Sequence, residues 1–349
     1  MGEGSRARSR SGFRRSRRLR ASRRGVVAVI GTLLALLVFF ALFGVFITQY
    51  VPLWMEDNES LLSSQVQGSL ALLKSGVDDQ YLFGGIQTYS VPFTLSSASV
   101  PLFAQPTVAT LAYLTGCSGG FNATTGAPVH AGACDYEAVS YTSGPGGSGS
   151  QSHPYSWNVA TNYLEVVVPN RYFTPGTYFF ENDGVTAAQN GFQQWMVVAP
   201  PLNVTKSQGT VSVMSSQVVL LGSPSTFTAG GSKEVTSTLL TNSSVSSANR
   251  FLTAAGAART FNVTLTLGVH EVCAWYNLLY NMTYAALGPA SSSTWNLTGS
   301  WSPSYTAPST TVCEQSISSS LDLTLKVFNV NYASSFVAQD QVSFNVGGL

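Results

Sequence analysis

Few side chains in this sequence have the types and spacing that acid–base chemistry requires. The close carboxylate pairs of its β-rich part are Asp135 with Glu137 and Glu181 with Asp183. Paired carboxylates can serve as a general acid and base, and clustered oxygen ligands can bind calcium. Both pairs lie in turn-like sequence, and Glu181–Asp183 has too few further oxygen ligands nearby for a calcium site. We interpret both pairs as turn residues.

The other residue patterns of known enzymes do not occur either. His130, His153 and His270 stand alone, without His-x-x-x-His or His-Glu-x-x-His spacing. No serine lies in a Gly-x-Ser-x-Gly setting, and no Gly-x-x-x-x-Gly-Lys-Ser/Thr string is present. We predict that the chain is not an enzyme, with no catalytic residue, no metal and no cofactor.

The cysteines indicate an oxidising compartment. Their number is even, which favours disulfides over free thiols, and the four are Cys117, Cys134, Cys273 and Cys313. Three pairings are possible, and we prefer Cys117–Cys134 with Cys273–Cys313 because each pair lies in one half of the β-rich part. Closing loops of this size stabilises by about 3–4 kcal/mol each in the chain-entropy model. A metal site is disfavoured because no pair has Cys-x-x-Cys spacing.

Seven asparagines begin an Asn-x-Ser/Thr sequon, which predicts a glycosylated surface protein. They are Asn58, Asn122, Asn203, Asn242, Asn262, Asn281 and Asn296. Sugars would add the solubility that few charges provide. We expect sequons inside strands, such as Asn262, to be unused.

Charge divides the chain into a basic tail and a mildly acidic body. Residues 1–24 hold ten arginines against one acid, so the remainder has 17 − 10 = 7 basic and 16 − 1 = 15 acidic groups, a balance of −8. Only 9% of all residues are charged, against about 25% in an average soluble domain. This composition is typical of secreted β-proteins and not of cytosolic enzymes.

A membrane span follows the basic tail. Residues 26–51 are almost entirely apolar, and about 20 helical residues cross the hydrocarbon core. The arginines before the span and the acids after it predict a cytoplasmic N-terminus and an extracellular C-terminal domain. The stretch is too long for a cleaved secretory signal, whereas twin-arginine export stays open. The arginines suit anionic lipid headgroups, and no motif indicates a nucleic-acid partner.

One resemblance concerns the junction of tail and span. Arg23, Arg24 and Gly25, followed by the apolar run Val26–Leu34, resemble the N-terminus of archaeal type IV pilins and archaellin-like proteins. The resemblance implies that a membrane peptidase cuts between Gly25 and Val26, and that the freed helices pack in the core of a filament. The segment Asn170–Val185 is similar to a Tyr-rich segment of archaeal pilin-like surface proteins. A minor pilin, a pseudopilin and a surface protein that does not assemble all fit this resemblance.

Beyond the span, the pattern predicts a helical stalk and then a mainly β fold. Apolar residues spaced by three and four over 59–80 are helical, and Pro52 is the expected kink. Strands are expected at 90–95, 108–114, 163–168, 177–180, 194–198, 210–221, 234–240, 260–267 and 321–330. The Asn182-Asp183-Gly184 sequence predicts a hairpin turn, and residues 270–284 predict one minor helix.

These elements divide the chain into four expected parts. They are a tail or leader at 1–25, a transmembrane helix at 26–51, a helical stalk at 52–85 and an extracellular β-sandwich-like domain at 86–349, with a sub-boundary near 200–207. The first functional hypothesis is a pilin-like structural or adhesive subunit at the cell membrane, in contact with membrane lipid, other pilin-like subunits and surface glycans. The second is a membrane-tethered receptor or a solute- or glycan-binding module that does not assemble.

Overall fold

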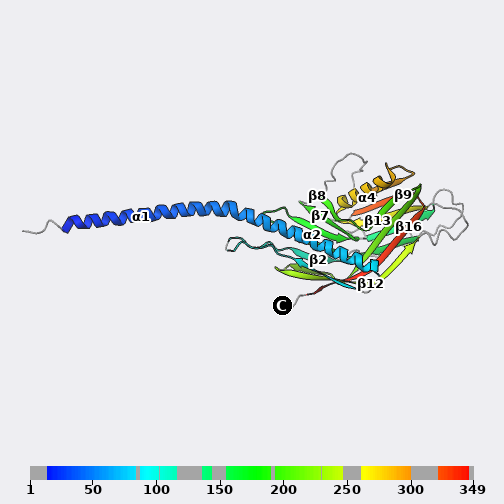
Figure 1. The fold of residues 1–349 in the computed structure, drawn as a ribbon, viewed down its shortest axis with the longest axis horizontal. Helices are drawn as coiled ribbons and strands as arrows, with labels where there is room; N and C mark the ends of the chain where they lie inside the picture. Colours follow the sequence, from blue (N-terminus) through cyan, green and yellow to red (C-terminus); the bar gives the residue numbers. More distant parts are fainter. Residues whose placement is uncertain are drawn as a thin grey trace, which may run out of the picture.

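The computed structural model describes residues 14–83, 87–101, 103–115, 136–143, 155–189, 193–228, 230–246, 261–299 and 321–345. A long helix projects from a body of three β-sheets (Figure 1). The expectations for Asp135, His130, His153, Asn122, Cys117, Cys134 and Cys313 fall outside the described residues.

The helix is continuous through three consecutive segments. They are α1 (Arg14–Val45), the π-helical turn η1 (Phe46–Tyr50) and α2 (Val51–Phe83). At 1.5 Å per residue the 70 residues extend for about 105 Å. The helix changes direction near η1 (Figure 1). Pro52 explains this bend, because its ring lacks an N–H and crowds the carbonyl of residue 48, and π-turns often accompany such kinks.

The first sheet contains the longest strands. Its order is β1 (Thr88–Thr94), β12 (Ser232–Ser246), β16 (Tyr332–Asn345), β10 (Thr210–Leu221) and β9 (Asn203–Ser207). All neighbours pair antiparallel except β10 and β16, which run parallel. The sheet is therefore mixed.

The other two sheets are antiparallel throughout. The second has the order β11 (Ser225–Thr228), β2 (Thr110–Leu114), β5 (Tyr163–Val168), β6 (Gly176–Glu181), β7 (Gly184–Gln189) and β8 (Gln193–Val198). The third has the order β14 (Trp295–Gly299), β15 (Leu321–Val330), β13 (Phe261–Val269), β3 (Tyr136–Ser143) and β4 (Tyr155–Ala160). The short helix α4 (Val272–Leu287) follows β13 directly.

Two apolar cores hold these layers together. In the first, one face of α2 packs between the first and second sheets through Leu62, Val66, Leu70, Leu73 and Val77, each at most 1% exposed. The second core lies beneath α4 and joins it to β9, β13, β14 and β15. The strand β10 serves both, because Val211 and Val213 lie in the second core whereas Val218 and Leu220 lie in the first.

Within the described residues, the structure confirms the predicted fold class of a long N-terminal helix, a mainly β body and one short helix. All nine expected strands are present, and three of them, β5, β10 and β15, have the predicted bounds. The minor helix lies at α4, close to the expected 270–284. The stalk helix runs through Gly76, whose absent side chain makes room for the ring of Tyr89. The division into four parts, with its sub-boundary near 200–207, stays a prediction.

Candidate functional site

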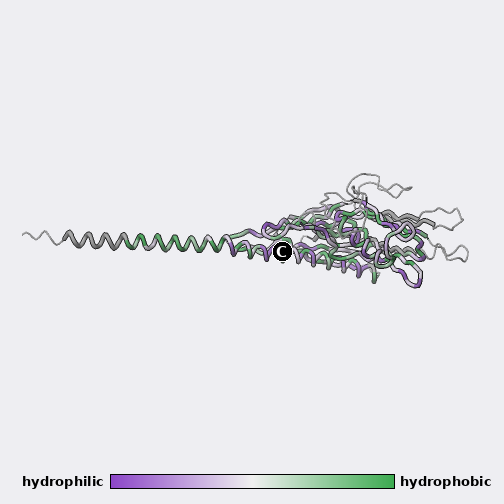
Figure 2. Tube along the Cα trace, turned by 90° about the horizontal axis from the view of Figure 1, so that it is seen from above, coloured by the Kyte–Doolittle hydropathy of each residue, from purple (hydrophilic) through white to green (hydrophobic). Residues whose placement is uncertain are grey.

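The outer part of the long helix exposes apolar side chains on every face. Fourteen large apolar residues between positions 27 and 47 are 37–69% exposed: Val27, Val29, Ile30, Leu33, Leu34, Leu36, Leu37, Val38, Phe39, Phe40, Leu42, Phe43, Val45 and Ile47. Leaving them in water would cost on the order of 20–40 kcal/mol, at about 1.5–3 kcal/mol for each side chain. Figure 2 shows the hydrophobic residues along this part of the helix. Such a surface is typical of a membrane span or of a signal sequence.

Backbone-directed hydrogen bonds make the same segment suitable for a hydrocarbon environment. Between Val27 and Thr48 the polar side chains are Thr32 and Thr48. The hydroxyl of Thr32 donates to the carbonyl of Val29 at 2.9 Å, and that of Thr48 donates to the carbonyl of Gly44 at 2.8 Å. Both hydroxyls are thus satisfied inside the helix, as a membrane interior requires. Within the described part of the chain, one helix is long enough and apolar enough to span a membrane, and it contains this segment.

The proposed leader junction lies inside α1, where the apolar segment begins. Gly25 and Val26 are both within α1, which begins at Arg14. The described part of the basic tail, from Arg14, and the apolar run are therefore continuous in one helix at the position where the resemblance places the cut. Cleavage there stays a prediction.

The inner half of the helix, α2, is fixed to the β-body by a buried carboxylate. Glu59 is 0% exposed, and its carboxylate accepts the hydroxyl of Thr107 and three successive backbone N–H groups, those of Arg171, Tyr172 and Phe173. The three N–H distances to Oε2 are 3.0, 2.7 and 2.8 Å. Consecutive N–H groups that converge in this way form an anion-binding nest, here occupied by the protein's own side chain.

These hydrogen bonds keep Glu59 ionised inside the protein. Burial alone would raise the pKa of Glu59, but the bonds from Thr107 and the three N–H groups hold its pKa below the ordinary value of 4.5. The neighbouring Asn170 adds a second link, because its side-chain amide donates to Ser63 Oγ on α2 at 3.0 Å. The loop at 170–173 therefore binds one turn of the helix through two polar side chains.

A second group of polar contacts fixes the far end of α2. Lys74 is 1% exposed and pairs with Asp78 at 2.6 Å and with Asp183 of the β6–β7 turn at 3.6 Å. Gln80 donates to the carbonyl of Ser237 on β12 at 3.0 Å, and its own Oε1 accepts the Ser237 hydroxyl at 3.2 Å. The inner helix therefore binds both the first and the second sheet with specific partners.

The predicted hairpin turn is present, and its tip is buried in the middle of the body. Asn182 and Asp183 have φ angles of 45° and 59°, as a two-residue turn between β6 and β7 needs. Glu181, Asn182 and Asp183 are at most 3% exposed. Gly184 is required here, because a Cβ would lie 2.8 Å from the indole of Trp275. Asp183 lies in the turn, as interpreted from the sequence, whereas Glu181 is the last residue of β6. The turn joins the two cores and does not face solvent.

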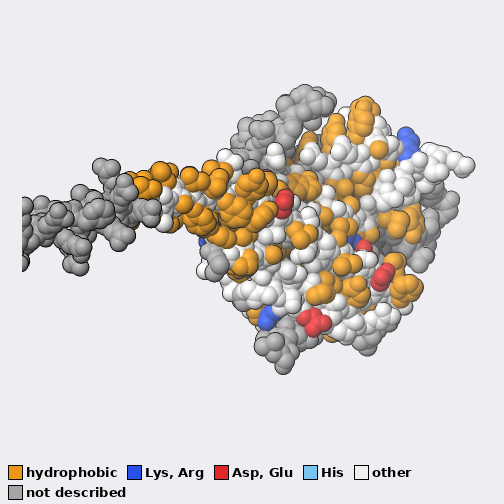
Figure 3. All heavy atoms as spheres, turned by 60° about the vertical axis from the view of Figure 1, so that its left-hand side comes forward, with side chains coloured by type: hydrophobic (Ala, Val, Ile, Leu, Met, Phe, Trp, Pro, Cys, Tyr) orange, Lys and Arg blue, Asp and Glu red, His pale blue; other side chains and the backbone are white. Residues whose placement is uncertain are grey.

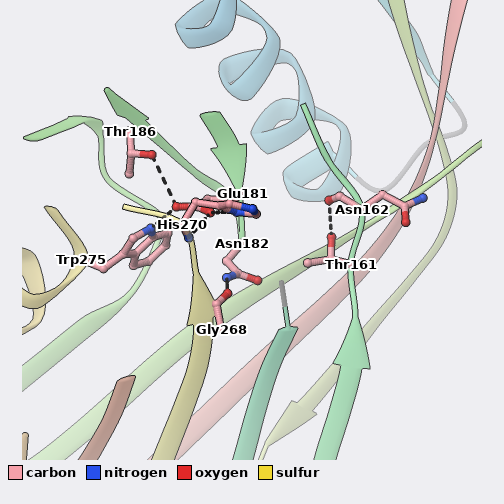
Figure 4. Close-up of polar contacts among 8 residues, drawn as sticks. All are labelled: Thr161, Asn162, Glu181, Asn182, Thr186, Gly268, His270 and Trp275. Atoms are coloured by element: carbon pink, nitrogen blue, oxygen red, sulfur yellow. Dashed lines mark hydrogen bonds and ion pairs between the residues drawn. The ribbon is translucent and has the colours of Figure 1, made fainter. Parts of the chain in front are cut away.

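Glu181 is the centre of a polar network at this junction (Figure 4). Its carboxylate accepts Trp275 Nε1–H at 2.8 Å and the backbone N–H of His270 at 2.9 Å, and it lies 3.2 Å from His270 Nδ1 and 3.4 Å from Thr186 Oγ1. The His270 ring stacks on Phe179, with ring centroids 4.9 Å apart. The amide of Asn182 donates to the carbonyl of Gly268 on β13. These partners come from β7, from α4 and from His270 between β13 and α4, so the network joins the second sheet to the β13–α4 connection.

Two further carboxyl groups border this network. Burial, and next the charge of Glu181, raise the pKa of Glu271 to about 8, while His270 lowers it and Glu165 raises it. Burial likewise raises the pKa of Glu165, with His270 opposing. Glu271 is 6% exposed. It is therefore a neutral acid in the folded protein at pH 7.

Glu271 gives a testable pH dependence of stability. The folded state retains its proton between pH 4.5 and about 8 while the unfolded chain loses it, so stability falls as pH rises through this window. The loss from this group at pH 7 is on the order of 3 kcal/mol. Glu271→Gln is expected to flatten the profile and to be more stable than wild type at pH 7. Denaturant unfolding in detergent at pH 5 and pH 7.5 measures both effects. If the free energy of unfolding changed equally between these two pH values in wild type and in Glu271→Gln, this account would be contradicted.

The described cysteine and sequons have distinct environments. Cys273 is 1% exposed at the start of α4 and is disulfide-bonded. Its partner lies outside the described residues, so the pairing stays a prediction. Asn203, Asn281 and Asn296 are exposed, whereas Asn58 is half-buried and donates to the carbonyl of Ala98, and Asn262 Oδ1 accepts the N–H of Asn329. The side chain of Asn242, on β12, is outside the description.

This contrast predicts which sequons carry sugar. In the natural host we expect glycans at Asn203, Asn281 and Asn296 and none at Asn58 or Asn262, because the first three side chains are exposed, whereas Asn58 and Asn262 are half-buried and hydrogen-bonded to the body. Glycopeptide mass spectrometry measures occupancy at each position. Full occupancy at Asn262, with the three exposed sites empty, would be the opposite of the expected result.

Two residues of this site, Glu59 and Lys74, were not singled out as functional from the sequence. Among the acids that follow the span, Glu56 and Asp57 are exposed, whereas Glu59 is buried. A signal did exist, because Glu59 and Lys74 lie at helical spacing from Leu62, Val66 and Leu70 and therefore share their buried stripe. The partnership of Glu181 with His270 has no local signal, since 89 residues separate the two.

Comparison with protein-family models, with curated proteins and with solved structures finds no match for this chain.

Proposed function

We propose that this chain is a non-enzymatic, membrane-anchored surface protein and a pilin-like structural or adhesive subunit. Its outer helix anchors it in the cell membrane with the N-terminus in the cytoplasm, and its β-body lies outside the cell. After cleavage between Gly25 and Val26 the same helix packs with those of other subunits. Membrane lipid and further pilin-like subunits are the partners of the helix, and surface glycans are the partners of the β-body.

The division of one helix into two environments carries this proposal. The outer half is apolar and solvent-exposed on every face, whereas α2 is amphipathic and is bound to the body through Glu59, Lys74 and Gln80. A helix that served only to complete the domain core would need no exposed apolar half. A cleaved signal sequence would need no continuity with a docked helix.

The position of the charges supports the orientation. Ten arginines precede the apolar segment, and the exposed acids Glu56 and Asp57 follow it. Arginines near the end of a span stay on the cytoplasmic side. Their removal by a peptidase would delete the group that holds the helix in the bilayer, so that the helix could then move into an assembly.

The composition of the β-body supports a structural or adhesive role. Only 9% of the chain is charged, and the buried polar groups Glu59 and Glu181 are bound by protein donors. A surface rich in Ser, Thr, Asn and Gln with few charges would bind glycans by many hydrogen bonds and by aromatic contacts. Tyr172 and Tyr284, 44% and 47% exposed, are available for such contacts.

Charge insertion tests the anchor. The double variant Leu37→Arg, Phe40→Arg places two charges in the middle of the span, each costing about 2.5–3.5 kcal/mol on the insertion scale. We expect most of the variant to leave the membrane fraction in alkaline carbonate, while wild type stays. Leu72→Arg, Leu82→Arg is the matched control, because these leucines are exposed on α2 (55% and 70%) beside the β-body and their replacement should leave the protein in the membrane. Equal retention of both double variants would contradict the proposed anchor.

A further inference from the structure

The connection between β1 and β2 runs back along the helix, away from the β-body. In Figure 1 it lies beside the helix close to the bend. Its tip places Phe103 with the ring centroid 5.9 Å from those of both Phe43 and Phe46. Val100, on the same tip, packs with Val51 and Met55 in a small core of its own. This loop therefore contacts the helix on both sides of the π-turn.

The loop is held in this position from three directions. Ser97 and Thr107 close its base, with the Ser97 N–H bound to the Thr107 carbonyl at 2.9 Å and the Thr107 N–H bound to Ser97 Oγ at 2.9 Å. Asn58 on α2 donates to the carbonyl of Ala98 at 3.2 Å. The Thr107 hydroxyl donates to Glu59. The loop is thus attached to the same carboxylate that docks the helix.

The tip lies at the depth of the membrane. From Val27 to Phe46 the helix rises about 30 Å at 1.5 Å per residue, which is the thickness of the hydrocarbon core. Phe43 and Phe46 are then at the outer edge of that core, and Phe103 contacts both. A bilayer around the helix would therefore also surround the tip.

The tip has the composition that such a position requires. From Val91 to Gly116 the chain has no ionisable side chain except Tyr113. Pro101 and Phe103 are exposed, Phe103 by 39%. Figure 3 shows the apolar surface of the helix continuing onto the adjoining face of the body. The ring contacts of Phe103 with Phe43 and Phe46 make the tip part of the same apolar surface as the span.

We propose that the tip around Val100, Pro101 and Phe103 is a second membrane contact, inserted into the outer leaflet next to the transmembrane helix. The tip contacts lipid at the boundary between headgroups and acyl chains. The contact fixes the tilt and rotation of the β-body on the membrane, which a single helix with a bend at Pro52 would leave free. This inference rests on the membrane anchor of the proposed function.

Depth-dependent quenching tests the second contact. Single variants Phe103→Cys, Leu37→Cys and Leu82→Cys of the full chain are labelled with a fluorophore that responds to polarity and reconstituted in phosphatidylcholine vesicles. The vesicles contain lipid with a nitroxide near the headgroup or near the end of the acyl chain. Pro101→Cys is a second tip variant that leaves Phe103 in place. Wild type, labelled in parallel, gives the background from native cysteines.

The expected result has three parts. The label at Leu37 is quenched more strongly by the deep nitroxide, the label at Leu82 is not quenched, and the labels at Phe103 and Pro101 are blue-shifted and quenched more strongly by the shallow nitroxide. Tip labels that behave like Leu82 while Leu37 is quenched would overturn the second contact and leave the anchor intact. Tip labels that are blue-shifted only at a high protein-to-lipid ratio, and that no nitroxide quenches, would show that the tip contacts a second copy of the chain. This result would also overturn the proposal. An unquenched Leu37 would overturn the anchor itself.

Discussion

Glu59→Ala is expected to lower the free energy of unfolding of the β-body by about 3–5 kcal/mol, because it strands several buried donors at once. The hydroxyl of Thr107 and the N–H groups of Arg171, Tyr172 and Phe173 lose their acceptor. Alanine cannot accept a hydrogen bond, and the nest would be left empty beside the helix. Denaturant unfolding of the full chain in detergent measures the loss.

Glu56→Ala is the matched control for this variant. Glu56 lies one turn earlier on the same helix and is exposed, so its removal should change stability by less than about 0.5 kcal/mol. Because the pKa of Glu59 is lowered on folding, its contribution is fully present above pH 4.5 and is lost as pH falls through the lowered pKa. The gap between wild type and Glu59→Ala should therefore shrink under acid. A gap independent of pH, or equal effects of the two variants, would show that the carboxylate is not the docking group.

Glu181→Ala is expected to have an effect of similar size at the other end of the body, about 3–5 kcal/mol. It removes the acceptor of Trp275 Nε1–H and of the His270 N–H, both buried or nearly so. The loss should appear in both cores, because the β6–β7 turn lies between them. Near-ultraviolet circular dichroism, which reports the surroundings of Trp275, should change together with the unfolding midpoint.

Trp275→Phe separates the network from simple packing at this position. It removes one donor and keeps an apolar ring against Gly184. It should lower the free energy of unfolding by about 1–3 kcal/mol. One hydrogen bond is lost while Glu181 keeps its other donors, and the smaller ring fills less space. If Trp275→Phe costs as much as Glu181→Ala, the indole packing and not the carboxylate network would be the joint.

Much of the architecture follows from local sequence patterns. The apolar run after the arginines indicates a span because composition alone decides hydropathy. The β5 strand, with Leu164, Val166 and Val168 buried in alternation, is visible from its period of two. The Asn182-Asp183-Gly184 turn is visible because few residues tolerate positive φ.

The parts not predicted depend on contacts between distant residues. The long strand β16 was missed because its sequence lacks a strong apolar alternation, and pairing with β10 and β12 on both sides determines it. The anion nest at 170–173 consists of backbone groups, which have no sequence signature. The Glu181 network joins residues 89 positions apart, and nothing near either residue indicates the other.

The mature N-terminus is the most direct test of the account as a whole. Protein purified from native membranes and analysed by peptide mass spectrometry is predicted to begin at Val26, with the ten-arginine tail removed and the apolar helix retained. A chain that still begins before Gly25 would contradict the pilin-like assignment and leave an anchored protein that does not assemble. A chain cut after the apolar segment would contradict the membrane anchor itself.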